Sequence, residues 1–146
     1  MEITTQNLTA HIPITAKQLT RTVKTILKSF HIQKGFLSFV FVNSGKIKSL
    51  NKKYLKRSYV TDVLAFDLLS EPQPRRLEGE IFICVPQARR NAKFFKNTPK
   101  DEIILYIIHG VLHLLGYDDH SAKDTARMRE KEKIVMEILR KKKVIR

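Results

Sequence analysis

Apolar and polar residues along the chain follow patterns that predict an alternation of strands and helices. Residues 2–8 and 36–42 are predicted strands, the second rich in aromatic and β-branched residues. Between them, Thr15 and Gln18 form a capping-box signature that opens a helix. The apolar positions of this helix recur at helical spacing and are Leu19, Val23, Ile26, Leu27 and Phe30. Its opposite face carries Lys17, Arg21, Lys24 and Lys28.

The middle of the chain continues the alternation. The elements predicted there are a helix at 44–55 with Ile47, Leu50 and Tyr54 facing inward, strands at 61–68 and 80–85, a loop at 71–74 and a helix at 86–95. After Thr98 and Pro99, residues 103–115 are apolar nearly all round, so this helix is predicted to lie at the centre of the fold. Gly116 is placed to end it.

Ser121 caps a predicted last helix, whose packing positions are Ile134, Val135, Ile138 and Leu139. Neither an internal repeat nor a low-complexity linker divides the 146 residues. The sequence therefore predicts one domain over residues 1–146. The apolar 103–115 helix is expected at its centre.

The composition of the chain indicates the cellular compartment in which it works. The chain is 42% hydrophobic and 29% charged, and its apolar runs fall short of the roughly 20 residues that span a bilayer. The N-terminus has neither a basic start nor an apolar signal core, so no secretory signal is expected. A single cysteine, Cys84, excludes an internal disulfide framework. These features favour a cytoplasmic protein.

Charge narrows the class of partner. Lys and Arg number 28 against 14 acidic residues, which gives a formal net charge of +14. An excess of this size attracts polyanions. RNA or DNA is the first candidate, an anionic membrane surface the second, and a cationic protein without a specific partner the third.

The candidate chemistry lies in residues 109–120, which hold three of the five histidines. His109 and His113 are four residues apart, so on a helix both side chains project from one face and can share one cation. The chain then leaves the helix at Gly116 and can return Asp119 or His120 to the same ion. Three nitrogen or oxygen ligands with an open fourth position are typical of catalytic zinc, and we predict one Zn²⁺ per chain.

Three other interpretations of these residues have weaker support. A histidine on an apolar helix is often a core residue hydrogen-bonded to backbone. Here two histidines lie four residues apart and are followed by a glycine and a third histidine, and this pattern favours a metal site. A closed structural site would need a fourth ligand, and Cys84, the only thiol, lies in a predicted strand. Zinc peptidases place a glutamate directly after the first histidine as a base, whereas this chain has Gly110.

Residues 109–118, His-Gly-Val-Leu-His-Leu-Leu-Gly-Tyr-Asp, resemble the signature of the YbeY family of bacterial metal-dependent endoribonucleases. Residues 50–54 and 61–66 are similar to a second block of that family, and 79–84 to its Gly-Asp-Ile-x-Ile-Cys strand, with Glu80 for the acid. The resemblance implies a single α+β domain, with a small mixed sheet surrounded by helices and the helix of His109 and His113 lining a cleft. It also implies cleavage of single-stranded RNA in ribosomal RNA maturation and ribosome quality control. The partners it implies are ribosomal RNA precursors and the small ribosomal subunit, with no membrane and no small-molecule cofactor.

The chain departs from the family pattern at two places. The family spaces its ligands His-x3-His-x5-His, but here Asp119 holds the third position and His120 follows one residue later. We favour His120 over Asp119 as third ligand, because imidazole suits zinc. The family also has an arginine directly after the aromatic residue of its second block, which is Tyr54 in this chain. Leu55 stands at that position here, followed by Lys56 and Arg57.

Arg57 is the better substitute for the family arginine, because its planar fork can hold two phosphate oxygens, whereas Lys56 offers a point charge. Both could equally be solvated loop charges. Candidates for the proton acceptor by residue type are Asp62, Asp118 and Asp119, and Asp62 could instead cap a strand edge. The competing functions are a zinc metallopeptidase-like hydrolase and a non-catalytic RNA-binding ribosome-assembly factor.

Overall fold

The computed structural model describes residues 1–55 and 61–145 of the chain. In chain order their helices and strands are β1 (Glu2–Asn7), α1 (Ala16–Ser29), β2 (Lys34–Val42), α2 (Ser44–Leu55), β3 (Val63–Asp67), β4 (Arg76–Cys84), α3 (Val85–Phe94), α4 (Pro99–Leu114) and α5 (Ala122–Lys141). The predicted capping box of the first helix is present, because the Thr15 and Gln18 side chains each accept from the other's backbone N–H. In the described ranges, none of the helices is both long enough and apolar enough for a membrane span.

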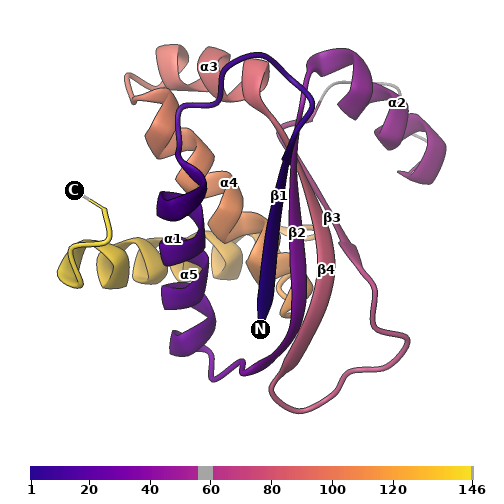
Figure 1. The fold of residues 1–146 in the computed structure, drawn as a ribbon, viewed down its shortest axis with the longest axis vertical. Coiled ribbons are helices and arrows are strands. Elements are labelled where there is room, and N and C mark those ends of the chain that lie inside the picture. The colour runs from indigo at the N-terminus through magenta and orange to yellow at the C-terminus, as the bar shows by residue number, and fades with distance from the viewer. Residues whose placement is uncertain (56–60, 146) are drawn as a thin grey trace.

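The strands form one sheet in the order β1-β2-β4-β3. β1 pairs parallel with β2 and β2 parallel with β4, whereas β3 runs antiparallel to β4 along the other edge. Helices α1, α4 and α5 lie over one face of the sheet, and α2 lies on the other side (Figure 1). The predicted α+β class with a small mixed sheet is confirmed.

Strand periodicity divides the apolar side chains between the two faces. On β2, Leu37, Phe39 and Phe41 join the main core beneath the helices. Val40 and Val42 point the opposite way, into a smaller cluster completed by Ile47 of α2. The main core also takes most of α4, which packs on the sheet and on α1, α3 and α5. This burial holds α4 as a rigid support for the side chains on its one polar face.

Gly110 brings α4 close to the sheet. A Cβ built at this position would lie 2.9 Å from the Cγ2 atom of Ile81 on β4, well inside van der Waals contact. The glycine is therefore a packing residue on the sheet side of the helix. Zinc peptidases have a glutamate at this position. Here a longer side chain would push α4 away from β4.

The prediction that Tyr54 and Ile134 pack against the body of the protein is wrong. Tyr54 is 54% exposed and meets Phe66 edge-on with ring centroids 5.3 Å apart, at the margin of the smaller cluster. Ile134 on α5 is 41% exposed, whereas its neighbours Val135 and Leu139 are buried. In both helices the buried stripe is narrower than the run of apolar residues, so the outer members are left at the surface.

Candidate metal centre

His109 and His113 lie one turn apart on α4, and their imidazoles converge. The two Nε2 atoms are 3.0 Å apart, and both rings are partly buried, with 23% and 27% of the side chains exposed. The four-residue spacing produces this geometry, because such side chains stack along one helix face. Two ring nitrogens facing a common point are suited to hold one cation.

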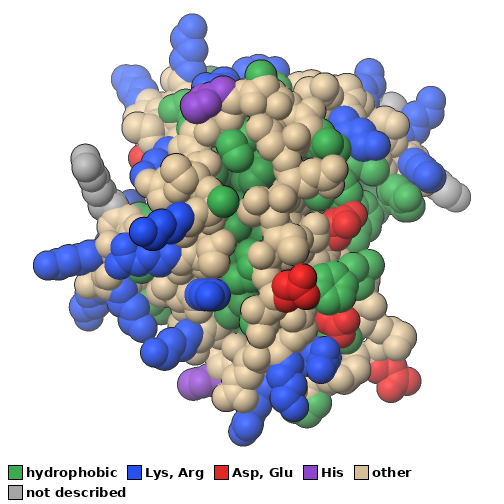
Figure 2. Space-filling view, in the orientation of Figure 1, with side chains coloured by type: hydrophobic (Ala, Val, Ile, Leu, Met, Phe, Trp, Pro, Cys, Tyr) green, Lys and Arg blue, Asp and Glu red, His purple; other side chains and the backbone are tan. Residues whose placement is uncertain are grey.

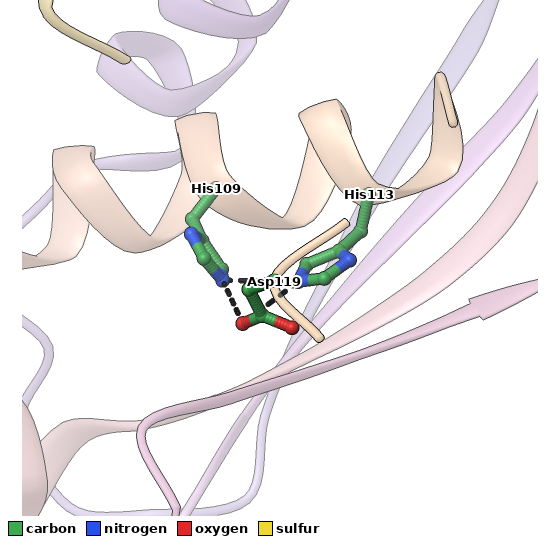
Figure 3. Close-up of side chains that lie close together, drawn as sticks. All are labelled: His109, His113 and Asp119. Atoms are coloured by element: carbon green, nitrogen blue, oxygen red, sulfur yellow. Dashed lines mark hydrogen bonds and ion pairs between the residues drawn. The ribbon is translucent and has the colours of Figure 1, made fainter. Parts of the chain in front are cut away.

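Asp119 brings a third donor to the same point by a reversal of the chain after α4. The helix ends at Leu114, and Gly116 takes φ +101°, a left-handed conformation that glycine adopts without strain. The chain then folds back, so that Asp119 Oδ2 lies 3.7 Å from His109 Nε2 and 3.6 Å from His113 Nε2 (Figure 3). A glycine at the helix end therefore assembles the site.

The spacing of the three donors fits a small divalent ion. With metal–ligand bonds of about 2.0–2.1 Å, the ligand atoms of a tetrahedral site lie about 3.3 Å apart. The three donor separations here are 3.0, 3.6 and 3.7 Å. Two imidazoles and one carboxylate also leave a fourth position for a water or substrate oxygen, as in catalytic sites.

His120 does not join His109, His113 and Asp119, although the sequence reasoning preferred it as third ligand. Its Nε2 is 3.1 Å from Asp118 Oδ1, and 72% of its side chain is exposed. Asp118, Asp119 and His120 form a second group of exposed residues in the described part of the chain. The geometry favours Asp119, because the one-residue offset sends the imidazole of His120 toward Asp118.

Glu132 is a functional residue that sequence reasoning missed. Its Oε1 accepts from Nδ1 of His109 at 2.6 Å, from a position on α5 that lies 23 residues further along the chain. A carboxylate that takes the Nδ1 proton fixes the tautomer and leaves the Nε2 lone pair directed at the ion. No local pattern around Glu132 indicates this role.

The two histidines differ in how they hold a proton. Burial by itself lowers the pKa of His109, but the hydrogen bond and charge of Glu132, with Asp62 and Asp119, raise it above its usual value. Burial and the neighbouring His109 lower the pKa of His113. His109 is therefore the imidazole at which protons compete with a metal ion.

A cavity of about 550 Å³ opens beside the donors, within the range typical of ligand sites. Asp62, directly before β3, lines it together with His109, Asp119 and Tyr106. Burial raises the pKa of Tyr106, and the negative charge of Asp62 raises it further, as it does that of His109. Asp62, one of the three candidate proton acceptors by residue type, thus lies beside the site, and its role stays a prediction.

The two candidate phosphate-binding cations, Lys56 and Arg57, lie outside the described residues. Leu55, at the position of the family arginine, ends α2 and is 46% exposed. The proposal that Arg57 or Lys56 replaces that arginine therefore stays a prediction.

Replacing Glu132 by Gln is expected to weaken metal binding by about 10- to 100-fold near pH 8, because the carboxylate that orients His109 is lost. The same change removes the charge that raises the pKa of His109. In the parent, affinity should fall as pH drops through that raised pKa; in the variant, this fall should begin at lower pH. Competition titrations with a chromophoric chelator from pH 5 to 8 measure both effects. Identical curves would show that Glu132 does not act on the site.

Known proteins match this chain over most of its length. The family described as Endoribonuclease YbeY matches residues 3–140. A Bacteroides thetaiotaomicron protein named Endoribonuclease YbeY is 33% identical over 133 residues, which cover 90% of this chain and 95% of that protein. One of the same name from Karelsulcia muelleri is 38% identical over 108 residues, 74% of each chain. A solution structure from Thermotoga maritima has a TM-score of 0.66 at 30% identity, covering 97% of this chain and 91% of its own.

Proposed function

Because this chain belongs to the Endoribonuclease YbeY family, we infer that it is a metal-dependent endoribonuclease that acts in ribosomal RNA processing. The observation that carries the inference is the convergence of His109, His113 and Asp119 on one point beside the 550 Å³ cavity. We propose Zn²⁺, one per chain, as the ion and single-stranded ribosomal RNA precursors as the substrate. The small ribosomal subunit is the partner that this substrate implies.

Different residues of the chain have different roles in the proposed hydrolysis. When bound, the ion supplies Lewis acidity toward a phosphoryl oxygen and lowers the pKa of a water. Glu132 holds His109 in the required tautomer at 2.6 Å, and the buried α4 fixes both imidazoles. We assign proton acceptance from the attacking water to Asp62, because its carboxylate lines the cavity beside the donors and is not one of them.

Surface charge supports a polyanionic substrate. Lys and Arg side chains project over α1 and the C-terminal end of α5 (Figure 2). A groove of about 760 Å³ there is lined by Lys17, Arg21, Lys24, Lys28 and Lys142. α1 contains no acidic residue, and in the described ranges none of these cations forms an ion pair. Like charges along a helix face destabilise it unless a counter-charge binds. RNA phosphates provide such a charge.

The competing functions lose support for separate reasons. A zinc peptidase needs a general base, and the position where one stands in such enzymes is occupied by the packing residue Gly110. A purely structural metal would be enclosed by four protein ligands. Here Asp119 has 44% of its side chain exposed, and a cavity of about 550 Å³ lies beside the donors.

One assay separates the three functions. We expect the zinc-loaded protein to cleave labelled single-stranded RNA and to leave casein intact. A chelator should abolish cleavage, and added Zn²⁺ should restore it. The His113→Ala protein, purified in the same way, controls for contaminating nucleases. Casein cleavage would favour the peptidase, whereas RNA binding without any cleavage would favour the assembly factor.

A further inference from the structure

Two phenylalanines stand in solvent where α3 meets α4. Phe94 is 79% exposed and Phe95 is 62% exposed, and their rings meet edge-on with centroids 4.9 Å apart. The phenylalanines of β2 at positions 39 and 41 are completely buried. A single exposed apolar residue needs no explanation, but an adjacent aromatic pair raises the question of what the rings contact.

The position of Phe95 distinguishes it from its neighbour. Phe95 lines the 550 Å³ cavity whose wall also includes Asp62, His109 and Asp119, whereas Phe94 does not. One residue of the pair therefore borders the space in which the proposed reaction takes place. It adds an aromatic side chain to a wall that also holds Tyr106, the two carboxylates and the imidazole.

The backbone holds Phe95 on a fixed turn. Its N–H donates to the carbonyl oxygen of Asn91 at 2.8 Å, and the N–H of Asn97 donates to the carbonyl oxygen of Ala92 at 2.7 Å. Lys96 between them takes φ +57°, a left-handed conformation that is strained for any residue with a Cβ. Asn97 Nδ2 then donates to Oε1 of the buried Glu102 at 3.1 Å, which ties the turn to α4. The ring is thus presented on a closed turn.

Cations flank the phenylalanine pair in the sequence. Lys93 and Lys96 are exposed on either side of the phenylalanine pair, and within the described ranges neither takes part in an ion pair. An aromatic ring next to unpaired cations is the arrangement by which proteins bind single-stranded nucleic acid. The base stacks on the ring, and the phosphates lie along the charges.

We propose that Phe95 is a stacking platform for a nucleobase next to the scissile phosphate of single-stranded RNA. This rests on the endoribonuclease function and adds to it how the substrate is placed. Because every base has a flat apolar face, the platform selects unpaired nucleotides and tolerates any base. A base held inside a duplex cannot reach it.

Binding to oligonucleotides that lack one base tests the contact directly. Zinc-loaded parent, Phe95→Ala, Phe95→Trp and Phe94→Ala proteins are titrated with labelled 2′-O-methyl 8-mers by fluorescence anisotropy. One abasic position is moved along the strand, and a gel verifies that each oligonucleotide stays intact. Phe95→Ala should bind about tenfold more weakly than the parent, Phe95→Trp should recover parent affinity, and Phe94→Ala should stay within about twofold.

The abasic series supplies the decisive comparison. At one position, loss of the base should weaken the parent about tenfold and leave Phe95→Ala unchanged, because the two changes remove the same contact. Additive losses at every position, or equal losses in Phe94→Ala, would overturn the proposal. Sedimentation of the parent and Phe95→Ala proteins also tests whether a second copy of the chain occupies the ring, which would overturn it as well. Cleavage of unmodified RNA by the parent reports on the proposed function separately.

Discussion

Asp119→Ala is expected to lose bound zinc and RNA cleavage together, whereas His120→Ala keeps both. Asp119 Oδ2 lies 3.7 and 3.6 Å from the two imidazole Nε2 atoms, but His120 is paired with Asp118. Loss of an orienting outer carboxylate already weakens such sites by 10- to 100-fold, so removal of a ligand should weaken binding by more than about 100-fold. His113→Ala should behave like Asp119→Ala, because it also leaves two donors.

Elemental analysis after dialysis against a weak chelator measures the metal, and cleavage of labelled RNA measures the activity. The adjacent His120→Ala variant is the matched control, since it alters the same exposed turn. If His120→Ala loses zinc and Asp119→Ala keeps it, the third ligand is the imidazole that the sequence reasoning preferred. The turn after Gly116 would then have to rearrange when metal binds.

Asp62→Asn is expected to slow RNA cleavage by about 10²- to 10⁴-fold while the zinc content stays unchanged. The amide keeps the size of the side chain and removes its ability to take a proton from water. Asp62 lines the cavity with His109 but is not part of the group formed by the three donors. Its removal should therefore affect the rate and spare the metal. Single-turnover rates at saturating RNA isolate this effect from binding.

Asp67→Asn is the matched control for this experiment, because Asp67 lies at the other end of β3 and is exposed. Its rate should equal that of the parent. An Asp62→Asn protein that cleaves RNA at the parent rate would exclude Asp62 as proton acceptor, and Asp118 would then be the next carboxylate to test.

The sequence correctly predicted the features that depend on residues close together along the chain. The convergence of His109 and His113 follows from their spacing of four residues, and the cap at Thr15 follows from the identity of two residues. The strands were found with shifted ends: β4 begins at Arg76, before the predicted position 80, because pairing with β2 extends as far as Lys34. Such an extension depends on a partner strand that local sequence does not reveal.

Contacts between distant segments were beyond such reasoning. Glu132 meets His109 only because α5 crosses α4, and Phe95 reaches the cavity through the turn that Lys96 and Asn97 close. The third ligand depends on how far the chain turns after Gly116, where one residue decides between Asp119 and His120. Residue type favoured imidazole, whereas the direction of the backbone favours the carboxylate.

The bond between His109 and Glu132 also affects how the protein behaves during its own synthesis. A chain leaves the ribosome from its N-terminus, and its early segments can fold before the later ones appear. The sheet is complete once β4 has emerged at Cys84, yet the carboxylate that orients His109 arrives only with α5. A growing chain can therefore form its sheet while its metal centre is still unfinished. The three donors and Glu132 all follow β4 in the sequence, so the metal centre is completed after the sheet.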